Sequence, residues 1–119
     1  MRELKYRVYD PNQKKLVYFD LHNITVSDNL LCQHYYPVQQ YTGLTDSNDK
    51  EIYEGDILKI PFDVGGDVIG QVLYEADHGG YIFQWKRKGP NQDYNNLNCD
   101  LAFESVIIGN IFEHRELLK

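Results

Sequence analysis

The sequence predicts an all-β protein built as a small antiparallel barrel. Two features of its 119 residues support this fold class. The apolar side chains include ten tyrosines, five phenylalanines and one tryptophan, and aromatic side chains suit the half-buried surface of a pleated sheet. Turn-forming residues also recur about every ten residues, which is the spacing of short strands in a sandwich or barrel.

The N-terminal segment predicts a β-hairpin. Polar and apolar residues alternate over residues 5–9, and residues 10–12 (Asp-Pro-Asn) favour a turn. Residues 16–19 then supply the second strand. Residues 20–38 show no clear element, although residues 24–26 fit a short strand.

Further short strands follow the hairpin. We expect them at residues 40–43, 52–53, 57–60, 68–74, 81–85 and 106–112. The glycine pairs at 65–66 and 79–80 are typical of hairpin turns. Gly70 stands inside a strand where a side chain would normally pack, which indicates a barrel corner or a close backbone approach. Consecutive strands joined by short turns predict an antiparallel meander.

Helical signals are weak: we expect about one turn within residues 97–105 and another within 114–119. The expected core consists of apolar residues that alternate with polar neighbours. These are Val8, Leu44, Ile52, Ile57, Ile60, Val72, Ile82, Trp85, Ile107 and Ile111.

Charge and cysteine content narrow the function class. The formal net charge is -6, which disfavours non-specific binding to nucleic acid or anionic lipid. Residues 1–15 are an exception, because they carry five basic and two acidic side chains. We see no signal peptide and no membrane-spanning segment, so we interpret Cys32 and Cys99 as reduced thiols of a cytoplasmic protein.

Three segments resemble one protein family in the same order along the chain. Residues 40–58 read QYTGLTDSNDKEIYEGDIL and resemble the signature of the YopX family. Residues 2–10 (RELKYRVYD) resemble its N-terminal strand. Residues 106–113 (VIIGNIFE) with 116–118 (ELL) resemble its C-terminal motif.

The resemblance implies an SH3-like barrel with an N-terminal β-hairpin extension, encoded by a phage or prophage and acting in the cytoplasm of a bacterial host. We therefore expect one YopX-like domain over residues 1–119, with a hairpin and connector at 1–39, the barrel at 40–113 and a tail at 114–119. Asp49 departs from the family pattern, which usually has glycine at this place. Aspartate adopts positive φ less readily than glycine.

No residue pattern predicts catalysis, a cofactor or a metal. Cys32, His34, His78 and Cys99 are possible zinc ligands, but their spacing does not match a zinc site. The acidic loop at 46–51 lacks the glycine and the final glutamate of a calcium loop, so we expect a solvated hairpin turn. Nucleophile elbows and phosphate-binding glycine loops are also missing from the sequence.

Two candidate contact regions remain. A nucleic-acid site would combine the basic N-terminal strand with an aromatic-plus-basic cluster, since aromatic rings stack on bases and cations neutralise phosphates. Its residues would be Arg2, Lys5, Arg7, Trp85, Lys86, Arg87 and Lys88. A self-association site would use the apolar run at 29–38, because such a run often marks an interface. Its residues would be Leu30, Leu31, Tyr35, Tyr36 and Val38, unless the run folds as a lid over its own barrel.

The leading functional hypothesis is a non-enzymatic binding or assembly module that contacts proteins, including further copies of itself in a homo-oligomer. The alternative is a nucleic-acid-binding barrel that uses the basic N-terminal strand and the loop at 85–88. Opposite placement of these two basic regions on the folded molecule would favour protein binding.

Overall fold

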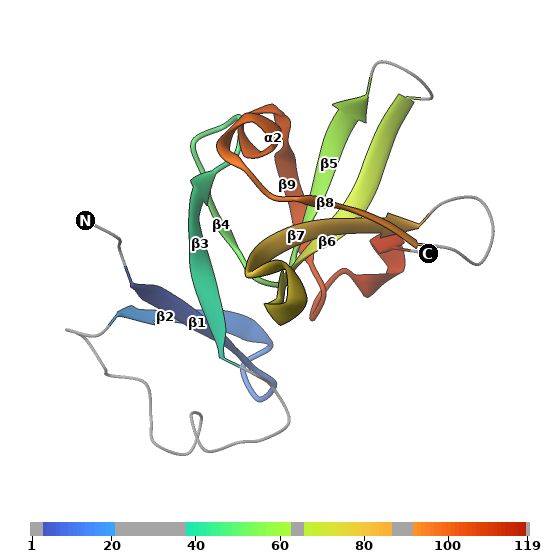
Figure 1. Cartoon of the computed structure of the whole chain (residues 1–119). Helices are drawn as coiled ribbons and strands as arrows, with labels where there is room; N and C mark the ends of the chain where they lie inside the picture. Colours follow the sequence, from blue (N-terminus) through green and yellow to red (C-terminus); the bar gives the residue numbers. More distant parts are fainter. Residues whose placement is uncertain (1–3, 21–37, 63–65, 87–91, 119) are drawn as a thin grey trace.

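The computed structural model describes residues 4–20, 38–62, 66–86 and 92–118 (Figure 1). Within these ranges the chain is mostly β-strand, in two antiparallel sheets, which confirms the all-β prediction. The first sheet has the order β2-β1-β3-β4 and the second β8-β7-β6-β5-β9. The strands are β1 Lys5–Asp10, β2 Lys15–Asp20, β3 Gln39–Thr45, β4 Glu51–Tyr53, β5 Asp56–Phe62, β6 Gly66–Glu75, β7 Gly80–Lys86, β8 Gln92–Asn96 and β9 Val106–Asn110.

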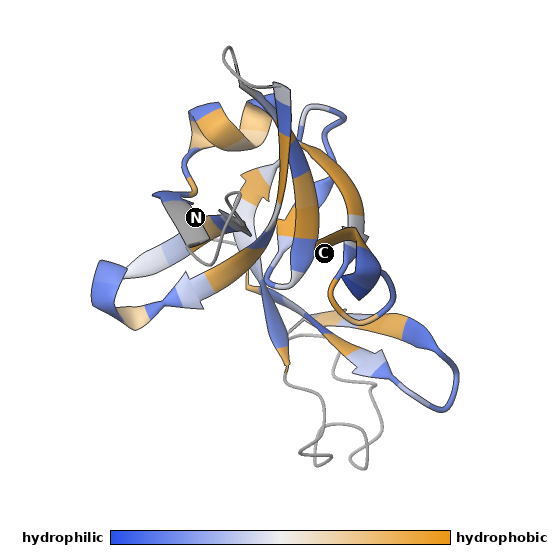
Figure 2. Cartoon of the chain, turned by 90° about the vertical axis from the view of Figure 1, so that its right-hand side faces the viewer, coloured by the Kyte–Doolittle hydropathy of each residue, from blue (hydrophilic) through white to orange (hydrophobic). Residues whose placement is uncertain are grey.

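The predicted N-terminal hairpin is present as β1 and β2. Its register runs without interruption from the pair Lys5 and Asp20 to the pair Asp10 and Lys15. β1 also pairs with β3, so the hairpin is hydrogen-bonded into the first sheet. In Figure 2 the tip of this hairpin projects away from the second sheet.

The second sheet contains the predicted meander of β5, β6 and β7, with the predicted last strand, β9, beside β5. It also contains β8, which the sequence did not predict, beside β7. This sheet curls into a half-barrel. At Gly70, in the middle of β6, the backbone of the neighbouring strand β7 comes very close. A Cβ atom at Gly70 would collide with the Gln84 carbonyl oxygen and come within 2.9 Å of the Phe83 ring. The predicted close backbone approach at Gly70 is therefore confirmed.

Most of the predicted core is buried. The main cluster consists of Ile52, Leu58, Ile60, Val72, Phe83 and Ala102. Leu44, Trp85 and Ile107 pack against it while staying partly exposed. Val8 is buried in a second, smaller cluster with Val17 and Phe19. Ile57 and Ile82 are also buried, and Ile111 is partly buried.

Within the described ranges, the helical pieces are short. The helix α2 spans Cys99–Glu104, and Asn98 caps its start by accepting a hydrogen bond from the Leu101 N–H at 2.8 Å. Two 3₁₀ turns, η1 and η2, cover Ala76–His78 and Arg115–Leu118. In the described part of the chain no helix has the length and apolar character needed to cross a membrane.

The loop between β3 and β4 is hydrogen-bonded to the second sheet through its first residue, Asp46. The expectation of a solvated turn is wrong for this residue. Asp46 is only 1% exposed. Its Oδ1 accepts hydrogen bonds from the backbone N–H groups of Asn48 and Lys50, each at 2.9 Å. Its Oδ2 accepts one from the Ile107 N–H in β9, also at 2.9 Å. One carboxylate thus shapes the turn and ties it to the second sheet.

Candidate functional site

The best candidate site is a hollow of about 440 Å³ between the N-terminal hairpin and the barrel. We call it the hairpin–barrel hollow. Its lining comes from β1, β2, the β3–β4 turn, β4, β5 and β9. The lining residues are Arg7, Tyr18, Asp49, Lys50, Glu51, Tyr53, Asp56 and Ile107. Its volume is within the range of small-molecule and side-chain pockets.

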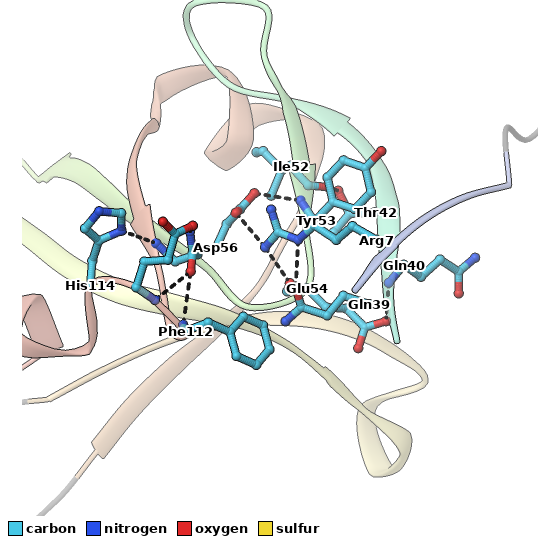
Figure 3. A network of polar contacts seen from close by, with 12 residues as sticks. Arg7, Gln39, Gln40, Thr42, Ile52, Tyr53, Glu54, Asp56, Phe112 and His114 are labelled. Atoms are coloured by element: carbon cyan, nitrogen blue, oxygen red, sulfur yellow. Dashed lines mark hydrogen bonds and ion pairs between the residues drawn. The ribbon is translucent and has the colours of Figure 1, made fainter. Parts of the chain in front are cut away.

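Arg7 forms the floor of the hollow, and its assignment as a nucleic-acid contact is wrong. The residue is 2% exposed. Its Nη2 lies 2.8 Å from Asp56 Oδ1 and donates to the Glu54 carbonyl oxygen at 3.0 Å. Its Nε donates to Gln39 Oε1 at 2.7 Å (Figure 3). Alternation along β1 turns Arg7 toward the barrel, so its charge is used within the molecule and cannot reach a phosphate.

Asp56 is the buried partner of this arginine. Burial raises the pKa of the Asp56 carboxyl, and the nearby Arg7 guanidinium opposes that rise. Its Oδ2 also accepts a hydrogen bond from the Tyr53 backbone N–H at 2.8 Å. The pairing of Asp56 with Arg7 joins two segments far apart in the sequence and was not predicted.

Two tyrosines give the hollow its aromatic character. Tyr53 is buried under the Arg7 guanidinium, whose central carbon lies 5.0 Å from the ring centroid. Burial, and secondarily the charge of Glu51, raises the pKa of the Tyr53 phenol to about 12. Tyr18 packs edge-on against Tyr53 with the ring centroids 5.3 Å apart, and is 56% exposed. Tyr18 is thus an open aromatic wall beside a rigid floor.

The rim of the hollow carries charged side chains of both signs. Lys5 pairs with Glu51 at 2.6 Å and lies 5.6 Å from the Tyr41 ring centroid. Asp49 and Lys50 are exposed in the turn above. The backbone φ of Asp49 is +63°, so this residue adopts the conformation that glycine would adopt more readily.

The structure describes only some of the remaining nucleic-acid candidates, and it does not bring Trp85 and the end of β7 beside the start of β1. Trp85 packs against the core and stacks on Phe83 with the ring centroids 5.4 Å apart. Lys86 ends β7, on the opposite side of the molecule from the start of β1 in Figure 1. The predicted contacts at Arg2, Arg87 and Lys88 lie outside the described residues.

The self-association candidates lie almost wholly outside the described residues. This applies to Leu30, Leu31, Tyr35 and Tyr36, so the prediction for the run at 29–38 stays a prediction. Val38, the last of the five, is 42% exposed. Of the possible zinc ligands, Cys32 and His34 also lie outside the described residues, while Cys99 is an exposed thiol.

A second hollow of about 410 Å³ lies between the end of β8 and α2. Its lining is polar except for one leucine. The residues are Asn95, Asn96, Asn98, Asp100, Leu101 and Glu104. Within the described ranges, no three His, Cys, Asp or Glu side chains come together as metal ligands would. Of these two hollows, the hairpin–barrel hollow is the better site, because it combines an exposed aromatic ring with a floor of hydrogen-bonded and ion-paired side chains.

The hairpin–barrel hollow was missed at the level of sequence, although part of its signal was visible. Alternation in β1 places Lys5, Arg7 and Tyr9 on one face. If another part of the protein covers that face, the arginine in its middle becomes buried. A buried arginine needs an acidic partner, so its position indicates a buried ion pair. Which acid it meets depends on how β5 is placed, and local spacing does not show this.

Comparison with known proteins gave a family match and matches to solved structures. The family model described as YopX protein matches residues 5–119. The crystal structure of protein EF1440 from Enterococcus faecalis is similar in fold, with a TM-score of 0.60 and 23% sequence identity over 98% of each chain. A comparison with curated proteins gave no match.

Proposed function

The chain belongs to the YopX protein family, and from this premise we propose that it is a non-enzymatic module that binds another protein through the hairpin–barrel hollow. The observation that carries the proposal is the exposed Tyr18 ring above a floor whose polar groups are already bonded to one another. Aromatic side chains that are open to solvent beside a formed pocket are common anchors in protein recognition.

The chemistry of the lining supports binding over catalysis. Among the described residues, the lining of the hollow includes no serine, cysteine or histidine. Its buried acid, Asp56, is held by Arg7 and by the Tyr53 N–H. The Asp56 carboxylate therefore has a structural role in the hollow, because both of its oxygens are already bonded within the protein.

Electrostatics support a protein partner over nucleic acid. Arg7 is buried in an ion pair and Lys5 is engaged by Glu51, so two of the expected phosphate contacts are occupied. The formal net charge of -6 also repels a polyanion. The family resemblance supports an origin in a phage or prophage, and the exposed Cys99 thiol supports a reducing, cytoplasmic location.

The test is affinity capture with matched tyrosine variants. The purified chain serves as bait in lysate from an induced lysogen, with and without nuclease. Tyr18→Ala removes the aromatic wall, and Tyr74→Ala removes a tyrosine of similar exposure, 53%, on β6. We expect the wild type and Tyr74→Ala to retain the same partner and Tyr18→Ala to lose it.

Two results would contradict the proposal. If nuclease abolishes capture, nucleic acid mediates the contact and the alternative function gains. If Tyr18→Ala retains the partner as well as Tyr74→Ala does, the hollow is not the contact site. Circular dichroism of both variants controls for loss of fold.

A further inference from the structure

The edges of the two sheets differ in how they are protected. The outer strands are β2 and β4 in the first sheet and β8 and β9 in the second. An unprotected edge exposes a row of backbone N–H and C=O groups that can pair with another chain. Proteins therefore cover or charge such edges unless they use them.

The β4 and β9 edges are covered by the chain itself. On β4, the Tyr53 N–H donates to Asp56 at 2.8 Å. Beside β9, the Ser47 N–H donates to the Ser105 carbonyl oxygen at 2.8 Å, and the Ile107 N–H donates to Asp46. At the far end of β9, the Asn110 N–H donates to His114 Nδ1 at 3.2 Å.

The β8 edge is protected by its composition. Its sequence is QDYNN, with an aspartate inside a short, polar strand. Charged and polar residues in an edge strand oppose the addition of a further strand.

β2 has neither kind of protection. Its interior, Leu16 to Phe19, reads LVYF, with no charge and no proline. Among the described residues, β2 pairs only with β1, in an unbroken register of six residue pairs. The tip of the hairpin also projects away from the second sheet (Figure 2).

We propose that β2 pairs antiparallel with β2 of a second copy of this chain, which makes a two-fold symmetric dimer. A two-fold axis perpendicular to the sheet leaves each residue and its copy on the same face of the joined sheet. Residues that are directly opposed across the two strands also share a face, so their sequence numbers are both odd or both even. Two central registers satisfy this condition: one pairs Val17 with Val17, and the other pairs Tyr18 with Tyr18.

Charge selects the first register. With Val17 on the axis, Leu16 faces Tyr18 of the second copy, and Lys14 faces Asp20 at both ends. Aliphatic–aromatic and opposite-charge pairs are favourable across strands. With Tyr18 on the axis, Leu16 would face Asp20, and the ionic pairing would be lost. Lys14 is exposed and precedes β2 directly, so it is available for this contact.

The dimer would also extend the hairpin–barrel hollow. Leu16 and Tyr18 lie on the same face of β2 by alternation, and Tyr18 lines the hollow. Leu16 of the second copy would therefore lie beside Tyr18 and lengthen the apolar wall. The dimer does not require that the hollow bind a partner, so the two proposals can fail separately.

Disulfide trapping tests the register. Val17→Cys is made in a background with Cys32→Ser and Cys99→Ser. A cysteine on the two-fold axis faces itself at about 4.5–5.5 Å between Cα atoms, within the range of a disulfide. We expect mild oxidation to give a covalent dimer for Val17→Cys. The matched control is Tyr74→Cys on β6 in the same background, which should still associate through β2 but give no covalent dimer. Equal cross-linking of both variants would overturn the proposal.

Sedimentation equilibrium tests the dimer without a cysteine and without changing the packed Val17. Wild-type chain should show reversible dimerisation below about 0.5 mM. Lys14→Asp, at an exposed turn, replaces two attractive end pairs by two repulsive ones and should weaken dimerisation by about tenfold. A monomer mass for the wild type at about 0.5 mM, or the same dissociation constant for Lys14→Asp, would refute the pairing.

Discussion

Replacing Asp46 by asparagine should destabilise the fold strongly, although the two side chains have almost the same shape. The Asp46 carboxylate accepts three backbone N–H groups, each at 2.9 Å. Asparagine keeps one carbonyl oxygen for the N–H groups of Asn48 and Lys50 but presents an NH₂ group to the Ile107 N–H. The variant therefore loses the hydrogen bond that ties the β3–β4 turn to β9.

The expected loss in unfolding free energy follows from this count. A hydrogen bond to a charged group contributes about 1.5–3 kcal/mol, and a donor left without an acceptor costs about 1–3 kcal/mol. Loss of the Ile107 bond together with weaker bonds in the turn gives about 3 kcal/mol for Asp46→Asn. This is a large share of the roughly 5–15 kcal/mol that stabilises a domain.

Urea denaturation measures the effect, with the fluorescence of Trp85 as the probe because Trp85 packs against the core. A loss of 3 kcal/mol should lower the midpoint by about 1–3 M urea. Asp49→Asn is the matched control, since it makes the same chemical change three residues later on an exposed side chain, and it should change stability by less than about 0.5 kcal/mol. Equal stability of the two variants would refute the conclusion that the Asp46 carboxylate stabilises the fold by bonding the β3–β4 turn to β9.

Three further predictions rest on the same structure. Gly70→Ala should destabilise by about 2 kcal/mol or more in urea, because the added Cβ collides with the Gln84 backbone; an unchanged midpoint would contradict the close approach. Arg7→Met should cost about 3–5 kcal/mol at pH 7, because it leaves Asp56 buried without its cation. Burial already raises the pKa of the Asp56 carboxyl, and loss of Arg7 raises it further. A carboxyl whose pKa is higher in the folded chain than in the unfolded chain, where it is about 3.9, stabilises the fold fully below that unfolded pKa. This stabilisation is lost as the pH rises through the pKa of the folded chain. The cost of Arg7→Met should thus be smaller at pH 4.5 than at pH 7 in parallel urea titrations, and a cost independent of pH would argue against an ionised Asp56. Asp49→Gly should raise stability by about 0.5 kcal/mol in thermal melts, since φ at this residue is +63°; a lower melting temperature would show that the aspartate makes a compensating contact.

Much of the fold could be predicted because its signals are local. The hairpin of residues 5–20 follows from alternation and from a turn sequence, and both act over a few residues. Gly43 and Gly55 have φ values of +87° and +84°, a conformation that glycine adopts readily. The short helical turns near both ends of β9 were also visible in the sequence.

The candidate site could be predicted only in part, because its contacts join distant segments. Asp46 was expected to be a solvated turn residue, yet its bond to Ile107 spans 61 residues. Arg7 was expected at a nucleic-acid surface, and the structure buries it against Asp56 and the Glu54 carbonyl oxygen. Charge and residue type suggest possible partners for such side chains, but they do not specify which partner is close.

The sequence by itself therefore determined the class of the fold, the positions of most strands except β8, most of the core and membership of a family. These follow from hydrophobic periodicity, turn chemistry and a long motif, all of which are written along the chain. Only the tertiary structure decided which charged groups are buried, where the hairpin–barrel hollow opens and which strands form the outer edges of the two sheets in the described part of the chain. The physical reason is that β-strand pairing brings residues from separate segments together, so their burial and their ion pairs depend on register and on which faces of the sheets meet.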